Sequence, residues 1–411
     1  MGAGKTSWAV QMMNDQKNSG KRYLYITPFL SEVQRIIDDC PGREFVEPKD
    51  GAGSKNKSDA LKLLLADGRN IASTHELFKR LDDTTLDLIR IRGYTLVMDE
   101  VMDVVEPLKL KPEKVAAMFN REVLRLQTVK DYDGSFFRVR AGQEEAFDEF
   151  AEYQRMAEMG RLVLVNGTLL MWLFPSPIFS AFREIYNLTY LFDGQIQKAY
   201  FDRFNLNYEY FTVAGSRDAG YRLIPHERGR TAEADRIAEF RKLVTIHDSD
   251  KLNGTGKADS SLSATWFTMR ACKADKQKLK KSVYTFFRWH AKGKSGENMW
   301  TTFKNQKQSL SGNGYARGFV PCTARATNMY RDRSNLAYCC NRYVHPFVKD
   351  FLNGDGFSID EDLFALSEMI QWIWRSRVRD GKPINVFIPS ARMRGLLISW
   401  LEGHWNGKPA D

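Results

Sequence analysis

Cysteine and histidine are scarce in this sequence of 411 residues, and neither residue type follows a metal-binding pattern. The five cysteines are an odd number without a Cys-x-x-Cys pair, which argues against a zinc site and against a framework of disulfides. The six histidines lack the spacing of metal ligands, so we expect each of them to be structural. Such a chain suits a reducing cytoplasm.

A signal peptide is also missing, because residues 1–6 contain no apolar segment. The only stretch apolar enough to suggest a membrane span, residues 162–179, is interrupted by polar residues and prolines well short of the ~20 residues that a span needs. We interpret it as a buried strand followed by a turn and expect no membrane partner.

Apolar and charged side chains, in contrast, are abundant. With 43% hydrophobic and 12% aromatic residues, the chain can bury a sizeable core, and its length suggests about two domains. The formal net charge of +10 favours a polyanionic partner such as nucleic acid, since lysine and arginine neutralise phosphates.

Short apolar runs alternate with helix-like segments along the chain, which is the pattern of an α/β fold with mainly parallel sheets. In the first lobe we predict strands at residues 23–27, 70–74, 94–98, 162–165 and 184–188. In the second lobe we predict strands at residues 243–246, 282–287, 299–303, 336–339 and 384–388. The predicted lobes are residues 1–214 and 215–411.

The chain begins with a glycine-rich loop, Gly2-Ala3-Gly4-Lys5-Thr6, followed at once by a helix-like segment. Glycines let backbone N–H groups approach phosphates, lysine neutralises their charge, and threonine at a helix N-terminus can bind Mg²⁺. We therefore predict that these five residues bind the phosphates of ATP and that Thr6 is a metal ligand. The alternative interpretation is an ordinary glycine-rich chain start.

The complete pattern of such a loop, GxxxxGK[ST], has a further glycine that would precede Met1. We therefore expect the loop and the strand before it to be truncated at the N-terminus. On this view the chain as given hydrolyses ATP poorly, and the buried strand that ends near Asp99 has an unpaired edge.

A carboxylate pair, Asp99-Glu100, follows the apolar run at residues 94–98. Ligands of α/β folds bind at the carboxyl ends of strands. Asp99 would hold Mg²⁺ through water, and Glu100 would act as the general base for the attacking water. Such pairs also occur at solvated strand ends, but the upstream GKT sequence favours the catalytic interpretation.

The order of these motifs resembles that of superfamily 2 DNA helicases. The first lobe contains GAGKT at 2–6, YITP at 25–28, STHELF at 73–78, DEVMD at 99–103 and LTYLF at 188–192. The second lobe contains WTTFK at 300–304, RATN at 325–328 and QWIWRSRVR at 371–379. DEVM together with GAGKT resembles the origin-binding helicases of herpesviruses and related replication helicases of bacteriophages.

This resemblance implies two RecA-like lobes that use ATP and Mg²⁺ and act on DNA as a helicase or translocase in phage or mobile-element replication. The expected surroundings are the cytoplasm of a bacterial host, and replication proteins are expected partners. The resemblance also implies DNA contacts at Thr302, Lys304, Thr327 and Asn328.

The last motif resembles QxxGRxxR, whose arginine reaches the γ-phosphate. Gln371 and Arg375 match this motif, and Gln371 would contact the nucleotide. Val378 occupies the place of the terminal arginine, so the finger is Arg375, Arg379 or, as a weaker candidate, Arg377.

We expect this motif to lie on one helix that starts with a capping box of Ser358 and Glu361 and is stopped after Asp380 by Gly381 and Pro383. A polar stripe with a period of four would be formed by Ser367, Gln371, Arg375 and Arg379. The alternative is a basic, solvated helix face.

Basic residues are concentrated at residues 270–294, where aromatic residues interleave or flank them. A protein that tracks phosphates and stacks bases would use such a mixture, so we predict DNA contacts at Lys278, Lys280 and Lys281. The alternative is an exposed lysine-rich helix beside a buried aromatic strand.

Two other functions are compatible with the sequence. A phage packaging ATPase also has a phosphate loop and a DE pair, but it needs a metal-binding acidic nuclease cluster in its second half. The acidic residues there are bunched at a predicted helix start, namely Asp355, Asp360, Glu361 and Asp362. The non-enzyme alternative is a DNA-binding protein with an inactive ATP site.

Overall fold

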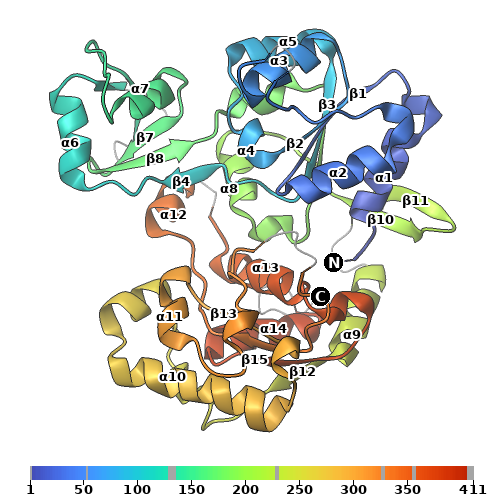
Figure 1. The fold of residues 1–411 in the computed structure, drawn as a ribbon, viewed down its shortest axis with the longest axis vertical. Helices are drawn as coiled ribbons and strands as arrows, with labels where there is room; N and C mark the ends of the chain where they lie inside the picture. Colours follow the sequence, from blue (N-terminus) through green and yellow to red (C-terminus); the bar gives the residue numbers. More distant parts are fainter. Residues whose placement is uncertain are drawn as a thin grey trace.

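The protein has two α/β lobes, one above the other, and a smaller antiparallel domain that projects from the first lobe (Figure 1). The computed structural model describes residues 2–51, 54–127, 136–226, 231–324, 329–353 and 358–404. Each lobe is built on a four-stranded parallel sheet, which confirms the predicted α/β class of two RecA-like lobes with mainly parallel sheets. Within the described residues, no helix combines the length and apolar character needed to cross a membrane.

The sheet of the first lobe has the strand order β2-β1-β3-β9. Its strands are β1 (Arg22–Thr27), β2 (Ile71–Thr74), β3 (Tyr94–Asp99) and β9 (Glu184–Leu188). The surrounding helices are α1 (Lys5–Asn14), α2 (Leu30–Asp39), α3 (Lys57–Ala66), α4 (His75–Phe78) and α5 (Asp83–Arg92).

Helices cover both faces of this sheet. Leu24 and Leu96 pack in the same cluster as residues of α3 and α5, whereas Tyr25 and Val97 pack with residues of α1 and α2. Because both faces are buried, β1 and β3 read as apolar runs, whereas the edge strand β9 is only partly buried and contains Glu184 and Asn187. The four predicted strands of this sheet are confirmed.

The edge of β3 differs from expectation. β3 pairs with β1 on one side and with β9 on the other, so it is an inner strand of the sheet. The prediction that the strand ending near Asp99 has an unpaired edge is wrong. The edges of this sheet, among the residues described, are β2 and β9.

The predicted strand at residues 162–165 exists, but it belongs to a different sheet. It is β7 (Leu162–Val165), which pairs antiparallel with β8 (Leu169–Leu173) through a turn at Asn166 and Gly167, both with positive φ. Asn-Gly is the preferred sequence of a tight hairpin turn. The parallel assignment of residues 162–165 was therefore wrong, because an apolar run alone does not specify its sheet.

This hairpin is part of the projecting domain, which lies in the chain between β3 and β9. Its sheet has the order β4-β8-β7-β6-β5. Its remaining elements are β4 (Val105–Pro107), β5 (Leu124–Gln127), β6 (Phe136–Ala141), α6 (Pro112–Asn120) and α7 (Ala151–Glu158). We call it the accessory domain.

The two lobes are joined by a segment that includes α8 (Ile196–Arg203) and an antiparallel hairpin. The strands of this hairpin are β10 (Phe211–Ser216) and β11 (Gly220–Pro225). Residues 214 and 215, where the predicted domain boundary falls, both lie within β10.

The sheet of the second lobe has the order β12-β15-β14-β13, all parallel. Its strands are β12 (Val244–His247), β13 (Asn298–Thr301), β14 (Asn335–Tyr338) and β15 (Ile384–Phe387). Its helices are α9 (Thr231–Leu243), α10 (Lys273–Thr285), α11 (Lys307–Leu310), α12 (Pro346–Leu352), α13 (Glu361–Ile373) and α14 (Ala391–Leu401).

The predicted strand at residues 282–287 is wrong. These residues form the end of α10 and the π-helical turn Phe286–Ala291 that continues it. Leu279, Val283, Phe286 and Phe287 are buried, and this spacing is helical.

The predicted helix over residues 358–380 is shorter than expected. Its N-cap is Asp360, whose carboxylate accepts hydrogen bonds from the amides of Asp362 and Leu363, so the proposed Ser358–Glu361 capping box is wrong. α13 ends at Ile373, and Ser376 then adopts an extended conformation with its hydroxyl donating to the Ile373 carbonyl. Serine competes with the helix backbone in this way.

The segment around α12 crosses from the second lobe back to the first. Phe351 is fully buried there, with its ring 5.3 Å from that of Phe136 in the accessory domain. The guanidinium group of Arg203 lies 4.6 Å from the centre of the same ring. α12 is therefore part of the core of the first lobe, although the chain on both sides of it belongs to the second.

Replacing Phe351 by alanine is expected to lower the free energy of unfolding by about 3 kcal/mol, because a buried aromatic ring and its two ring contacts are lost. Chemical denaturation measures this change. The matched control is Phe147→Ala in the accessory domain, whose side chain is 86% exposed and whose loss should cost less than about 0.5 kcal/mol. Equal effects of the two substitutions would contradict the assignment of α12 to the core.

Candidate nucleotide site between the lobes

The glycine-rich loop lies at the N-terminus of α1, and its backbone shape depends on glycine. Gly2 and Gly4 have φ angles of +70° and +73°, in the left-handed region. A Cβ atom on Gly4 would come within 2.4 Å of the Tyr221 ring, and one on Gly2 within 2.8 Å of the Trp374 ring. The loop is therefore packed between the β10–β11 hairpin and the second lobe.

Thr6 and Asp99 meet although 93 positions separate them in the sequence. The Thr6 hydroxyl donates a hydrogen bond of 3.2 Å to Oδ1 of Asp99 at the carboxyl end of β3. A hydroxyl and a carboxylate side by side are oxygen ligands of the type that Mg²⁺ prefers. These two predicted metal ligands are thus brought together, and their donor set fits the cation.

Glu100 follows Asp99 with a φ angle of +69°, which is unusual for a residue with a side chain. Such a conformation costs on the order of 1–3 kcal/mol and persists only where the surroundings enforce it. Here the Glu100 amide donates to the carbonyl of Leu188 in β9. The backbone therefore turns sharply at the carboxylate pair.

Lys5 lies among opposite charges. Burial lowers the pKa of the Lys5 amine, whereas the carboxylates of Glu100 and Asp99 act to raise it. Its Nζ is 5.9 Å from the centre of the Tyr190 ring. The predicted loop lysine and the predicted carboxylate pair therefore share one site.

α2 adds a further cation to this site. Arg35 pairs with Glu32 at 2.6 Å, and its guanidinium also lies 3.8 Å from Oδ2 of Asp99. Burial and the nearby Asp99 carboxylate raise the pKa of the Tyr25 hydroxyl well above its usual value. Asp99 is thus surrounded by Thr6, Tyr25 and Arg35.

The arginines at the end of α13 occupy different surroundings. Burial and Arg331 lower the pKa of Arg379, while Asp380 and Glu32 of the first lobe act to raise it. The pKa of Arg379 is therefore influenced by Glu32 in α2 of the first lobe. Arg377 instead donates from Nε to the carbonyl of Pro383 at 2.6 Å within its own lobe.

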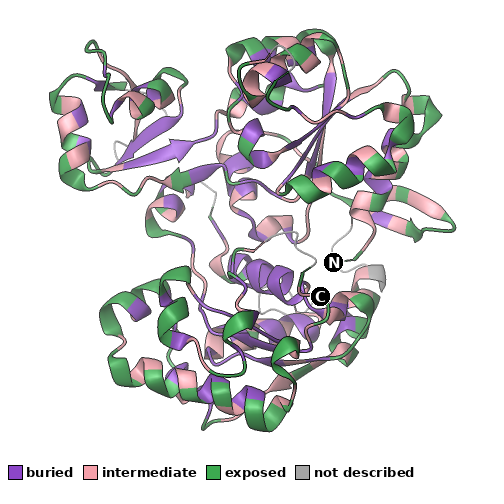
Figure 2. Ribbon diagram, viewed as in Figure 1, coloured by how far each residue is buried: buried purple, intermediate pink, exposed green. Residues whose placement is uncertain are grey.

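The other two residues of this motif are inside the second lobe. Gln371 and Arg375 are only 4% and 7% exposed, and Figure 2 shows α13 buried where the lobes meet. The alternative interpretation as a solvated basic face is therefore wrong for both residues. Gln195 of the first lobe donates to the Ser367 hydroxyl at 2.9 Å, so α13 is also a contact between the lobes.

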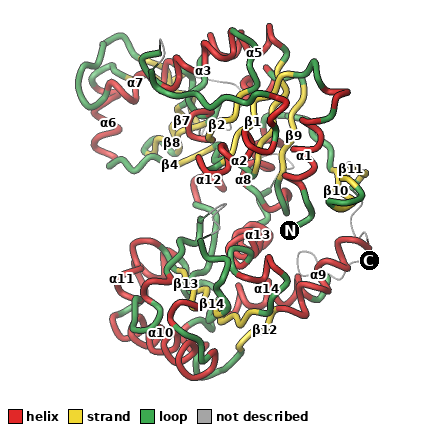
Figure 3. Tube along the Cα trace, turned by 45° about the vertical axis from the view of Figure 1, so that its right-hand side comes forward, coloured by secondary structure: helices red, strands yellow, loops and turns green. Residues whose placement is uncertain are grey.

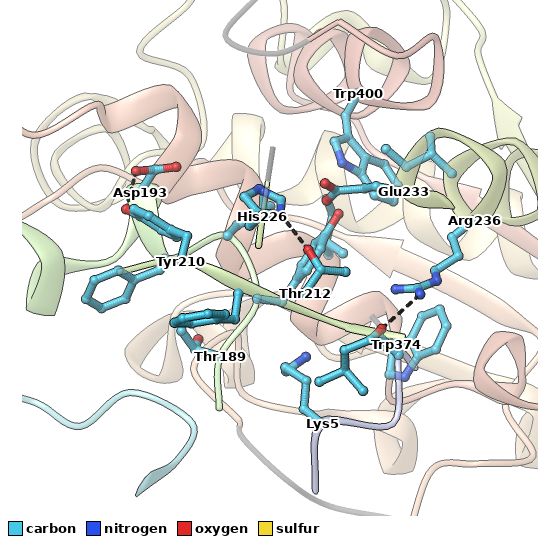
Figure 4. A pocket seen from close by; sticks show the side chains of 18 of the residues that line it. Lys5, Thr189, Asp193, Tyr210, Thr212, His226, Glu233, Arg236, Trp374 and Trp400 are labelled. Carbon is cyan, nitrogen blue, oxygen red and sulfur yellow. Dashed lines mark hydrogen bonds between the residues drawn. The ribbon is translucent and has the colours of Figure 1, made fainter. Parts of the chain in front are cut away.

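A cavity of about 160 Å³ lies beside Lys5 and was not predicted from the sequence (Figure 4). Glu233 and Arg236 of α9, Thr212 of β10 and Trp374 contribute to its walls. These residues come from segments far apart in the chain, and of the four only Trp374 lies in a motif identified in the sequence, at residues 371–379. No signal in the sequence would have brought them together.

The residues predicted to contact DNA do not form one surface. Lys278 and Lys281 are exposed on α10, Lys280 is partly exposed, and Figures 1 and 3 show α10 on the side of the second lobe away from the first. The three lysines line a shallow groove with Tyr284. Lys304 is exposed just after β13.

The remaining predicted DNA contacts are not at the described surface. Thr302 is fully buried, so its side chain does not reach solvent in this structure. Thr327 and Asn328 lie outside the described residues.

The acidic residues at the start of α13 have structural partners. Glu361 pairs with Lys349 at 2.5 Å and Asp362 with Arg392 at 2.6 Å, while Asp360 caps the helix. Asp355 lies outside the described residues. Within the described part of the chain, no three histidine, cysteine, aspartate or glutamate side chains converge on a common metal position.

Comparison with known proteins finds a close relative in a prophage. The chain is 39% identical over 411 residues to the SPbeta prophage-derived protein YonV of Bacillus subtilis strain 168, covering 98% of this chain and 97% of the relative. Residues 238–401 match the family described as the YonV C-terminal Rossmann-like domain.

Two solved structures align with the whole chain at low identity. They are Xpd4 of S. tokodaii, with a TM-score of 0.47, and an XPD helicase, with a TM-score of 0.39. Each is 11% identical to this chain, and the alignments cover 100% of this chain and 94% of the other.

Proposed function

The chain belongs to the YonV family, and we propose that it is an ATP-hydrolysing motor that moves along or unwinds DNA. The observation that carries this proposal is the hydrogen bond between Thr6 and Asp99. It joins a glycine-rich loop at a helix N-terminus to an acidic strand end, which are the two parts that phosphate binding and Mg²⁺ binding require.

In this proposal the backbone amides of residues 2–6 and the amine of Lys5 bind the phosphates of ATP. Thr6 and Asp99 would hold Mg²⁺, which would supply positive charge to neutralise the phosphates. Glu100 follows directly on the strand end and would orient and deprotonate the attacking water. The turn of the backbone at Glu100 supports a role that differs from that of Asp99.

Arg379 is the best placed of the candidate finger residues. Glu32 and Arg35 of the first lobe both influence the pKa of Arg379, and the Arg35 guanidinium lies 3.8 Å from Asp99. A cation supplied by the second lobe would stabilise negative charge on the transferred phosphoryl group only while the lobes are together. This dependence couples hydrolysis to the relative position of the lobes.

The DNA part of the proposal rests on charge. The net charge of +10 and the groove of lysines beside Tyr284 on α10 are suited to phosphates and to one stacked base. The relative YonV is derived from a prophage, so we assign the activity to phage DNA replication in the cytoplasm of a bacterial host, together with replication proteins.

Lys5→Ala and Glu100→Gln are each expected to lower ATP turnover at least about a hundredfold, because a phosphate ligand or a general base is lost. Steady-state phosphate release with and without DNA measures this, and unchanged circular dichroism shows that the fold is intact. The control is Glu184→Gln in β9, which removes a partly exposed carboxylate paired with Lys21 and should leave turnover unchanged. Full turnover by either site variant would refute the assignment.

Arg379→Ala is expected to reduce kcat by about a hundredfold or more, whereas Arg377→Ala should change it by roughly twofold at most. The reason is that Arg379 lies near the first lobe and Arg377 is bound to its own loop. ATP affinity should change much less than kcat if the arginine acts in the transition state. Equal effects of both substitutions would mean that neither is the finger.

Charge reversal of Lys278, Lys280 and Lys281 to glutamate is expected to weaken DNA binding and to flatten its salt dependence. Each lost phosphate contact lowers the slope of log K against log salt by about 0.9 for duplex DNA and about 0.7 for a single strand. The control reverses the exposed residues Lys17, Lys109 and Lys111, which changes the net charge equally. If both triple variants have the same slope, α10 is only a solvated helix.

A further inference from the structure

The cavity beside Lys5 is not used by the proposed chemistry. One end of it is formed by Ala3 and Lys5, and its walls come from the β10–β11 hairpin, α9 and the second lobe. Figure 4 shows Lys5 at its edge, with Glu233 and Arg236 projecting from α9 and Trp374 and Trp400 from the second lobe.

We propose that this cavity binds the purine base of the nucleotide whose phosphates are bound at residues 2–6. The inference rests on the proposed function, because it takes the phosphate site as given. The cavity would be the subsite by which the protein selects a nucleotide according to its base.

Size and shape fit one base. A volume of about 160 Å³ has room for on the order of ten water-sized groups, comparable to the heavy atoms of one purine. Phe240 stacks on Trp374 at 5.6 Å with an interplanar angle of 22°, and Trp400 meets Phe240 edge-on at 5.4 Å. An aromatic wall of this kind favours a flat, polarisable ligand over a sugar or an aliphatic chain.

Two opposite charges face the same space. Glu233 and Arg236 are three positions apart on α9 and therefore lie on one face of the helix. The Arg236 guanidinium donates to the carbonyl of Val213 over a long 3.4 Å, so this bond holds it only weakly. A carboxylate acceptor beside a guanidinium donor matches the edge of adenine, where an amino group adjoins a ring nitrogen. Cytosine has the same pair, so the preference for adenine over cytosine depends on the larger ring system filling the cavity.

The cavity is also held against the phosphate loop. Gln11 of α1 binds the backbone of Tyr221 twice, donating to its carbonyl at 2.9 Å and accepting from its amide at 2.7 Å. The hairpin that forms one wall is thereby attached to the helix that begins with Lys5 and Thr6. A base in the cavity and phosphates at the loop would consequently be held by one rigid unit.

The test compares ATP with inorganic tripolyphosphate, which has the phosphates but no base. Isothermal titration of the full chain with both ligands, and with GTP and CTP, gives the contribution of the base as a ratio of affinities. We expect a purine nucleotide to bind at least about tenfold more tightly than tripolyphosphate and than CTP.

Glu233→Gln keeps the size of the side chain and removes its charge, and Arg236→Gln shortens the side chain and removes its charge. Each is expected to lower the ratio of ATP affinity to tripolyphosphate affinity by about tenfold, and charge effects on the phosphates cancel in this ratio. The control is Glu239→Gln on the same helix, where the carboxylate is 70% exposed and paired with Lys242 outside the cavity. Its ratio should equal that of the unaltered protein.

An unchanged ratio in both cavity variants would overturn the base site while leaving the phosphate site intact. Equal binding of CTP and ATP would do the same. If the unaltered protein binds neither ATP nor tripolyphosphate, the proposed function fails and this inference fails with it.

Discussion

The contact between Thr6 and Asp99 is the interaction on which the rest of this site depends. Thr6 is the second residue of α1, and Asp99 is the last residue of an inner strand, so the bond sets the glycine-rich loop against the carboxyl edge of the parallel sheet. Strand ends in such sheets carry free backbone groups and point to the same edge. The same edge therefore receives Glu100, and both carboxylates act to raise the pKa of Lys5.

The second lobe reaches this edge through α13 and the turn after it. α13 is apolar nearly all round and is buried on every side, which a helix between two packed bodies requires. Because the helix ends at Ile373, the chain turns there, and Trp374 is placed against Gly2. The period of four predicted a longer helix, in which Ser367, Gln371, Arg375 and Arg379 would lie along one face.

Much of the fold and part of the site followed from the sequence, for identifiable reasons. Strands buried on both faces are long apolar runs, and the Asp99-Glu100 pair was recognisable because it ends such a run. Residues 282–287 were wrongly predicted as a strand, because closely spaced apolar residues occur both in buried strands and on the buried face of a helix. The turn at Asn166 and Gly167 makes residues 162–165 part of an antiparallel hairpin, and the Asn-Gly sequence is the local signal for that turn.

The cavity walls were beyond prediction for a different reason. Tyr190, Thr212, Glu233 and Trp374 become neighbours only after the hairpin has docked on α1 and the lobes have met. Tyr190 and Trp374 belong to motifs identified in the sequence, but neither motif predicts contact with Thr212 or Glu233. Sites made by tertiary packing are visible in coordinates and not in a single sequence.

Apart from the contact of α13 with Gln195, the two lobes are attached to each other at two separate places. One is the joining segment with the β10–β11 hairpin, which binds α1 through Gln11. The other is α12, whose Phe351 is buried against Phe136 and Arg203. A relative motion that keeps both attachments is a rotation about the line between them, because any translation would break one. Arg379 belongs to neither of these two attachments, so a rotation of this kind would change the distance between Arg379 and Asp99.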